Sequence, residues 1–131
     1  MLDTSAWLAA YHHAWITHNA EQLAQLFTED AVYHSHPFRP PYRGQAEIRT
    51  YWQRSTPSQE ELEVRWGTPV VSGNRVAIEW WAMMRDTEEG ELTLPGCLLL
   101  RFAESGLCEE LREYWHVEMG RRILPPAGWG K

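Results

Sequence analysis

Three turn signals in the second half of the chain constrain its fold more than any other feature. They lie at Ser72-Gly73-Asn74, Asp86 to Gly90 and Glu104-Ser105-Gly106. The runs around them are rich in β-branched and aromatic residues and span Leu62 to Trp66, Arg75 to Arg85, Thr93 to Phe102 and Cys108 to Glu118. Strands joined by short turns pair antiparallel. The second half of the chain is therefore predicted to form an antiparallel meander.

The first half of the chain has a helical pattern instead. We predict helices from Thr4 to about Thr17, from Asn19 to Phe27 and from Gly44 onward, with a short strand from Ala31 to Pro37 between the second and the third. Helices followed by a meander indicate an α+β fold in which one curved antiparallel sheet wraps the N-terminal helices. The length suits one domain, so residues 1–131 are expected to form a single unit.

Charge and hydropathy exclude several classes of partner. Eighteen acidic residues against twelve basic ones give a net charge of −6, and Lys131 is the only lysine, so no basic stripe could neutralise nucleic-acid phosphates. No stretch approaches the ~18 apolar residues of a membrane span, and the first residues lack the basic and apolar regions of a signal peptide. We therefore predict no nucleic-acid or membrane partner and a cytoplasmic location.

Eight tryptophans are many for a chain of this size. Aromatic residues at this density fill a small core quickly, and the excess commonly lines a ligand pocket or an interface. Trp66, Trp81 and Met83 are expected on the outer face of the sheet. Apolar side chains on an exposed sheet face mark an interface, so we predict a homodimer.

The segment from Val32 to Gly44 carries two histidines on the predicted first strand. His34 and His36 are two residues apart, and the prolines that follow end the strand. Side chains at i and i+2 of a strand share a face, so both imidazoles are expected to point into the same space. Because an imidazole titrates near neutral pH, both are candidates for acid–base work.

Three segments carry a resemblance to a known family: LFTEDAVYHSHPF, RGQAEIRTYW and RFAESGLCEELREYW. Their order and spacing resemble those of the nuclear transport factor 2-like superfamily, and most closely its SnoaL-like branch, from Trp7 to Val117. The resemblance implies a cone-shaped α+β fold with a hydrophobic pocket at its open end, and chemistry without a cofactor. It does not define the activity, because the superfamily includes ketosteroid isomerases, polyketide cyclases, epoxide hydrolases, dehydratases and non-enzymes.

The resemblance also allows two known sets of catalytic residues to be compared with this chain. The oxyanion-binding Tyr, general-base Asp and protonated Asp of ketosteroid isomerases correspond to Tyr11, His36 and Leu98. The last-strand Asp and the central Arg and Asp of the epoxide hydrolases correspond to Glu113, Trp80 and Ala82. Each set is incomplete, so neither mechanism transfers whole.

Strand alternation and the first helix together predict the lining of the pocket. It comprises Tyr11, Trp15, His34, His36, Ile78, Trp80, Ala82, Leu98, Leu100, Leu111, Glu113 and Trp115. An unpaired charge at Glu113 would be costly there, and His36 is its predicted partner. In this hypothesis His36 is the base, Glu113 orients it and Tyr11 donates to a developing oxyanion. A shift of one residue in register would instead leave Glu113 in solvent.

A second hypothesis treats His34, His36 and Glu113 as a metal site. Two histidines and a carboxylate suit nonhaem iron or zinc. The chain has no further Cys, Asp or His at a spacing that would complete the coordination, and the resemblance implies cofactor-free chemistry. We therefore predict neither a metal nor another cofactor.

The sequence thus predicts a protein that binds a small, largely apolar, cyclic or carbonyl compound. Two classes of function stay open. One is a cofactor-independent acid–base enzyme of isomerase, cyclase, dehydratase or hydrolase type. The other is a non-catalytic ligand-binding or assembly module, in which the same aromatic side chains simply fill the cone.

Overall fold

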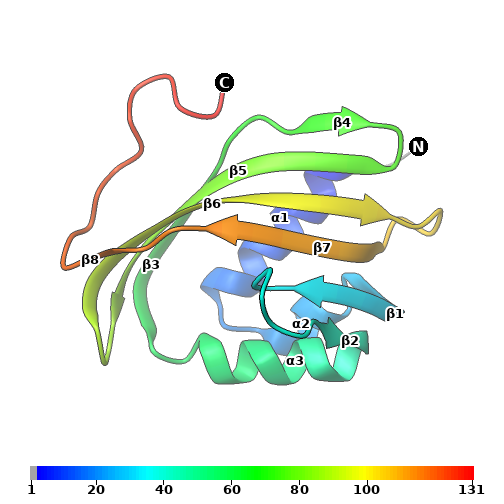
Figure 1. Ribbon diagram of the computed structural model, residues 1–131, viewed down its shortest axis with the longest axis horizontal. Coiled ribbons are helices and arrows are strands. Elements are labelled where there is room, and N and C mark those ends of the chain that lie inside the picture. The colour runs from blue at the N-terminus through cyan, green and yellow to red at the C-terminus, as the bar shows by residue number, and fades with distance from the viewer. Residues whose placement is uncertain (1–2) are drawn as a thin grey trace.

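The first half of the chain holds the helices, as predicted. The computed structural model describes residues 3–131, with helices α1 (Thr4–Ile16), α2 (Ala20–Ala24) and α3 (Gly44–Ser55) (Figure 1). Asp3 rather than Thr4 caps α1, because its side chain accepts a hydrogen bond from the backbone N–H of Ala6. Asn19 caps α2 in the same way. Among the described residues, no helix is both long and apolar enough to cross a membrane.

One curved sheet forms the rest of the fold. Its strands are β1 (Phe27–His34), β2 (Tyr42–Arg43), β3 (Gln59–Trp66), β4 (Val70–Ser72), β5 (Arg75–Asp86), β6 (Gly90–Phe102), β7 (Cys108–Trp115) and β8 (Glu118–Met119). The order is β2-β1-β7-β6-β5-β3, while β4 pairs with β5 and β8 pairs with β6. The strands β3 to β7 are antiparallel, as the turn signals predict. Strand β1 instead runs parallel to β7, so the sheet is mixed.

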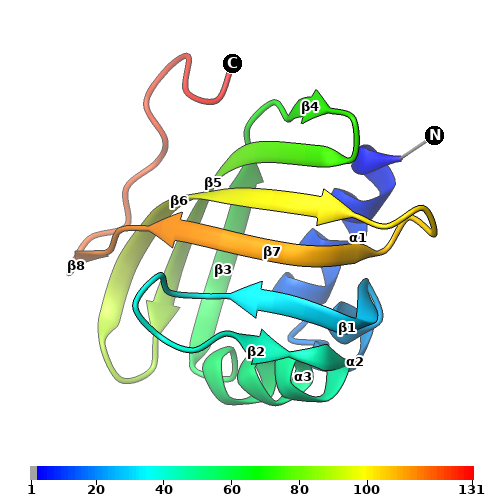
Figure 2. The same ribbon diagram turned by 45° about the vertical axis from the view of Figure 1, so that its right-hand side comes forward.

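The concave face of the sheet encloses the core. Figure 2 shows the sheet bending around α1, with α3 below the edge that β1 and β2 form. Trp7, Leu8, Tyr11, Ala14 and Trp15 are the buried residues of α1, and they pack with the inward side chains of β5, β6 and β7 in one cluster. This is the α+β cone predicted from the sequence.

The register of β1 differs from the prediction by one residue. The strand ends at His34, and its buried residues are Phe27, Ala31 and Tyr33. His34 lies opposite Arg112 of β7, and Arg112 is exposed on the outer face of the sheet. The aromatic ring of Tyr33 is buried, and its burial turns the neighbouring even positions, Val32 and His34, outward.

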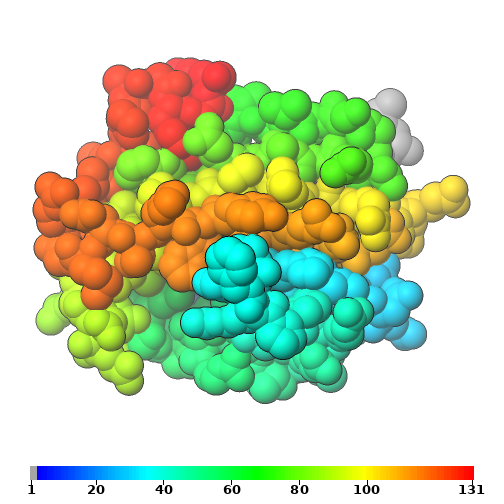
Figure 3. Space-filling model, in the orientation of Figure 1, coloured from blue at the N-terminus to red at the C-terminus, as the bar shows by residue number. Residues whose placement is uncertain are grey.

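The predicted apolar patch on the outer face is also corrected. Trp66 pairs with Trp80 across β3 and β5 and packs against Tyr11 with ring centroids 5.9 Å apart, so it faces the core. Met83 is 0% exposed, and Trp81 packs edge-on against Trp129. Figure 3 shows the C-terminal residues, coloured orange to red, at the left-hand end and upper edge of the molecule, beside the strands.

Residues 120–131, here called the C-terminal segment, are held against the sheet by specific bonds. The Thr93 hydroxyl donates to the carbonyl of Arg121 and accepts from the N–H of Ile123, both at 2.8 Å. Arg122 donates to the carbonyl of Glu61 at 2.7 Å. The Trp129 indole donates to Glu79 at 3.1 Å. The segment forms no helix or strand, and these bonds anchor it to the sheet.

These contacts predict a role for Trp129 in stability. Trp129→Ala should lower the free energy of unfolding by about 1–2 kcal/mol, because it removes both a ring contact with Trp81 and a hydrogen bond. Trp129→Phe keeps the ring contact alone and should cost less. Urea unfolding measures both values. Equal stability of Trp129→Ala and the parent protein would show that the segment does not hold the sheet.

Candidate functional site

A cavity of about 190 Å³ lies inside the cone, between the helices and the concave face of the sheet. Its lining comes from α1, β1, α3 and the inner faces of β3, β5, β6 and β7. The residues are Tyr11, Trp15, Tyr33, Tyr51, Trp52, Ser55, Thr56, Gln59, Trp80, Leu94, Glu113 and Trp115. Seven of these twelve are aromatic and one is acidic, so the cavity is an apolar space with a single carboxyl group.

The structure brings some of the predicted lining residues together. Tyr11, Trp15, Trp80, Glu113 and Trp115 all line the cavity. The predicted aliphatic residues lie in the packed core instead, and these are Ile78, Ala82, Leu98, Leu100 and Leu111. They are buried in the core cluster, but they do not line the cavity.

The two histidines do not reach the cavity. His34 lies on the outer face of the sheet, where its Nε2 is 4.0 Å from a carboxylate oxygen of Glu110. His36 follows the end of β1, and its Nδ1 accepts a hydrogen bond from the backbone N–H of Phe38 at 3.1 Å. Among the described residues, no hydrogen bond or ion pair joins His36 to Glu113, because β1 ends at His34, before His36.

The positions of the two histidines also leave the metal hypothesis without a common centre for its three ligands. His34, His36 and Glu113 do not converge, and within residues 3–131 no three His, Cys, Asp or Glu side chains gather as metal ligands. The chemistry of the cavity must come from the residues that line it.

Several lining residues were missed from the sequence. Tyr33 was missed through the register of β1, although Ala31 and Tyr33 are buried while Val32 and His34 are not, as in a strand with one buried face. Trp52 of α3 is buried in the core and also lines the cavity. Ser55, Thr56 and Gln59 lie where α3 ends and β3 begins, and such a junction has no periodic signal.

Glu113 is the central ionisable group. It lies opposite Leu98 of β6 and faces the cavity. Burial raises the pKa of its carboxyl from 4.5 to about 8, and a hydrogen bond from the Tyr33 hydroxyl opposes that rise. The Tyr33 hydroxyl is also 3.4 Å from that of Tyr11. A chain of two hydroxyls therefore leads from α1 to the carboxyl.

The tyrosines remain proton donors across the working pH range. Burial, and next the negative charge of Glu113, raise the pKa of Tyr11 and of Tyr33 well above 10.0. The same two causes raise the pKa of Tyr51 to about 12. Glu113 is thus the group in the cavity that exchanges a proton between pH 5 and 9.

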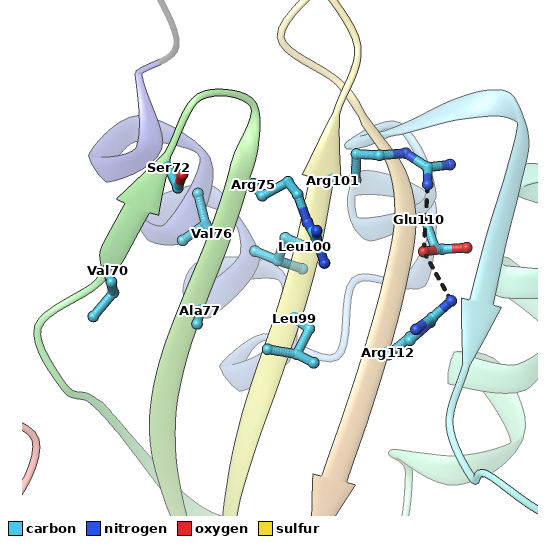
Figure 4. A pocket seen from close by; sticks show the side chains of 10 residues that line it. All are labelled: Val70, Ser72, Arg75, Val76, Ala77, Leu99, Leu100, Arg101, Glu110 and Arg112. Atoms are coloured by element: carbon cyan, nitrogen blue, oxygen red, sulfur yellow. Dashed lines mark ion pairs between the residues drawn. The ribbon is translucent and has the colours of Figure 1, made fainter.

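A larger hollow lies on the opposite face of the sheet. It has a volume of about 420 Å³, and Figure 4 shows it spread across β4, β5, β6 and β7. Glu110 forms ion pairs there with Arg101 and Arg112. Its ionisable groups are exposed or paired with one another, whereas the carboxyl group in the inner cavity has no ion-pair partner among the described residues. We therefore place the candidate site inside the cone.

The cone and its aromatic cavity define a small-molecule-binding domain. Residues 8–111 match the model of the SnoaL-like domain. The chain belongs to the SnoaL-like domain family. No curated protein matches this sequence.

Solved structures share the fold at low identity. A protein of ketosteroid isomerase-like fold from Catenulispora acidiphila, in complex with trimethylamine, is 22% identical with a TM-score of 0.75 and covers 86% of each chain. The epoxide hydrolase/cyclase-like enzyme SalBIII, which has a role in pyran ring formation in salinomycin, is 17% identical with a TM-score of 0.76, covering 88% of this chain and 94% of its own. A protein from Shewanella denitrificans described as a SnoaL-like polyketide cyclase is 18% identical with a TM-score of 0.74, covering 86% and 89%.

Gly96 sets the position of one cavity wall. A Cβ added at Gly96 would lie 2.5 Å and 2.6 Å from two ring atoms of Trp80, its neighbour across the sheet. Gly96→Ala should therefore displace the indole and cost about 1–3 kcal/mol of stability. Adding Trp80→Leu removes the clash, so the double variant should lose less than the sum of the two single losses. Thermal unfolding measures all three, and additive losses would contradict the contact.

Glu113 should make stability depend on pH. Below pH 4.5 the carboxyl is protonated in both folded and unfolded chains, and between 4.5 and about 8 only the unfolded chain ionises. Folding stability contributed by this group therefore falls across that window. Glu113→Gln removes the effect, so its melting temperature relative to the parent should rise by several degrees from pH 5 to pH 9. Glu110→Gln, on the outer face, should show no such trend.

Proposed function

We propose that the chain is a small-molecule acid–base enzyme in which Glu113 exchanges a proton with a ligand held in the aromatic cavity. The observation that carries this proposal is the position of Glu113, the one acidic residue lining the aromatic cavity, beside Tyr33 and Tyr11. Burial there raises the pKa of the carboxyl to about 8. A catalytic group works best when its pKa lies near the operating pH, because both protonation states are then available. Strongly shifted carboxyl groups in cavities are candidates for catalysis.

The volume limits the ligand to a small molecule. An apolar cavity of ~150 Å³ holds benzene, whereas drug-sized ligands need about 300–1,000 Å³. The 190 Å³ here suits a single small ring or a compact branched molecule. The likeness to the protein solved with trimethylamine supports a ligand of that size. A small cyclic or carbonyl compound fits this description, and a fused steroid does not.

The roles of the residues follow from their contacts. Glu113 as the carboxylate accepts a proton from the bound molecule, and as the acid returns it at another atom. The Tyr33 hydroxyl donates its one proton to the Glu113 carboxylate. The Tyr11 hydroxyl also lines the cavity and stays protonated, so it supplies the donor for a developing oxyanion. Tyr11 keeps its predicted role in this scheme, while Glu113 replaces His36 as the base.

Assembly and location are proposals as well. We propose a homodimer, formed through the part of the outer face that the C-terminal segment leaves open, where Val70 of β4 is 70% exposed. Sedimentation at micromolar concentration tests it, and a monomer would refute it. A cytoplasmic location is proposed from composition, and cell fractionation tests it.

Proton exchange offers a direct test of the acid–base proposal. In D₂O, the protein should accelerate deuterium incorporation at the α-carbon of cyclopentanone, followed by NMR. The rate should rise with pH and level off above about 8, as the Glu113 carboxylate forms. Glu113→Gln should lower the rate ~10²–10⁴-fold, and the control Glu110→Gln should not.

The same experiment separates the two open classes of function. His36→Ala should keep the exchange rate, because His36 lies outside the cavity. If small ketones raise the melting temperature through Glu113 and Tyr33 yet exchange no proton, the chain is a non-catalytic ligand-binding module. That result would refute the enzyme proposal and leave the cavity as a binding site.

A further inference from the structure

The carboxyl group of Glu113 lacks a counter-charge. Among residues 3–131, Glu113 is the only charged side chain that lines this cavity. His34 and Arg112 share a second hollow of about 210 Å³ with Glu113, but the ion pairs of both within these residues are with Glu110. The one side-chain hydrogen bond that holds down its pKa comes from Tyr33. A carboxylate in a low-dielectric space is stable only when a cation or several donors face it. Within the cavity, the described residues provide Glu113 with neither a cation nor several hydrogen-bond donors. Because the carboxyl group lines the cavity, a bound ligand could contact it.

The tryptophan walls turn their polar edges away from the cavity. The Trp15 indole donates to the side chain of Gln59 at 2.8 Å, and that of Trp115 donates to the carbonyl of Ser35 at 3.1 Å. The indole nitrogens of Trp52 and Trp80 are closed off from solvent and have no partner within residues 3–131. The four indoles therefore present ring carbons, not N–H donors, to an occupant.

The walls meet at nearly right angles. Trp15 stands at 89° to Trp52 with ring centroids 5.5 Å apart, and at 73° to Trp80 with centroids 5.4 Å apart. Tyr11 stands at 89° to Trp15 and 87° to Trp52. Rings in this arrangement form the sides of a box. Aromatic faces carry partial negative charge and attract cations, and such boxes recognise alkylated ammonium groups.

We propose that the ligand of this cavity carries a small alkylated ammonium group, seated among Trp15, Trp52, Trp80 and Trp115 and paired with the Glu113 carboxylate. This inference rests on the proposed function, since it names the substrate class of the same site. It joins the two unusual features of the cavity, an aromatic box and an unpaired carboxyl group. The ammonium supplies the missing counter-charge, and its alkyl groups contact the ring carbons.

The pairing also connects binding to catalysis. A bound cation stabilises the carboxylate over the acid, so the ligand itself converts Glu113 into the form that accepts a proton. The other groups facing Glu113 are Tyr11 from α1, Tyr33 from β1 and Tyr51 from α3, and all three stay neutral up to pH 9. Trp80 and Leu94 from β5 and β6, and Gln59 from β3, carry no charge. On the other side of β7, His34 and Arg112 share a hollow with Glu113 but do not line the cavity. Among the residues that line the cavity, Glu113 therefore sets the pH dependence of binding.

Two probes of the same shape test the proposal: choline, and its neutral isostere 3,3-dimethylbutan-1-ol. Titration calorimetry at pH 6, 7 and 8 should show choline binding more tightly than the alcohol. The dissociation constant of choline should fall about tenfold per pH unit up to pH 8, with release of one proton per ligand at pH 6. The alcohol should show no such rise in affinity, because it needs no carboxylate.

Two variants, each with a matched control, complete the test. Glu113→Gln should weaken choline at pH 8 at least about tenfold and leave the alcohol unchanged, while Glu110→Gln should alter neither. Trp115 is 41% exposed, so Trp115→Leu leaves the core intact and should weaken choline more than the alcohol. Tyr114→Leu, one residue away and 48% exposed, is its control.

The outcomes separate this inference from the function on which it rests. If the alcohol binds as tightly as choline, or if both bind better below pH 8, the cavity takes neutral ligands and the ammonium inference is refuted while the binding site stands. If choline does not bind at millimolar concentration, the ammonium inference is likewise refuted. Proton exchange into cyclopentanone then decides the proposed function by itself.

Discussion

The burial of one carboxyl group inside an aromatic cone is the constraint on which the site depends. Glu113 occupies an inward position of β7, and the apolar surroundings raise its pKa to about 8. That arrangement costs folding free energy near neutral pH, because the unfolded chain can ionise the group freely. A sheet strand holds the carboxyl in place, and the Tyr33 hydroxyl is the nearby group that offsets part of the cost.

The aromatic residues serve the core and the cavity at once. Tyr11 packs on Trp7 and on Trp52, and its hydroxyl also approaches that of Tyr33. Trp80 lies over Gly96, where any side chain would push the ring away from the sheet. The walls are therefore fixed by the same contacts that stabilise the fold. A cavity with rigid walls binds without the entropy cost of ordering its side chains.

The alternation of apolar residues and the turn signals between strands predicted the regular strands of the sheet. They did not predict the features that have no repeating pattern. The turns at Ser72-Gly73-Asn74 and Glu104-Ser105-Gly106 separate strands as expected, and Leu111 with Trp115 correctly placed Glu113 on an inward face. Two features had no repeating signal. The C-terminal segment binds through single bonds such as that of Trp129 to Glu79, and a shifted pKa depends on neighbours from distant strands, which sequence spacing does not reveal.

The alternation of inward and outward side chains along β1 determines whether a tyrosine or a histidine lies near Glu113. Because β1 runs parallel to β7, Tyr33 lies opposite Leu111 and His34 lies opposite Arg112. Successive residues of a strand face opposite sides, so one residue of slip would bring His34 inward in place of Tyr33. A cationic imidazole there would supply the counter-charge that Glu113 lacks and would lower its pKa. The phenol at Tyr33 donates a hydrogen bond but brings no charge, and the carboxyl therefore remains available to a ligand.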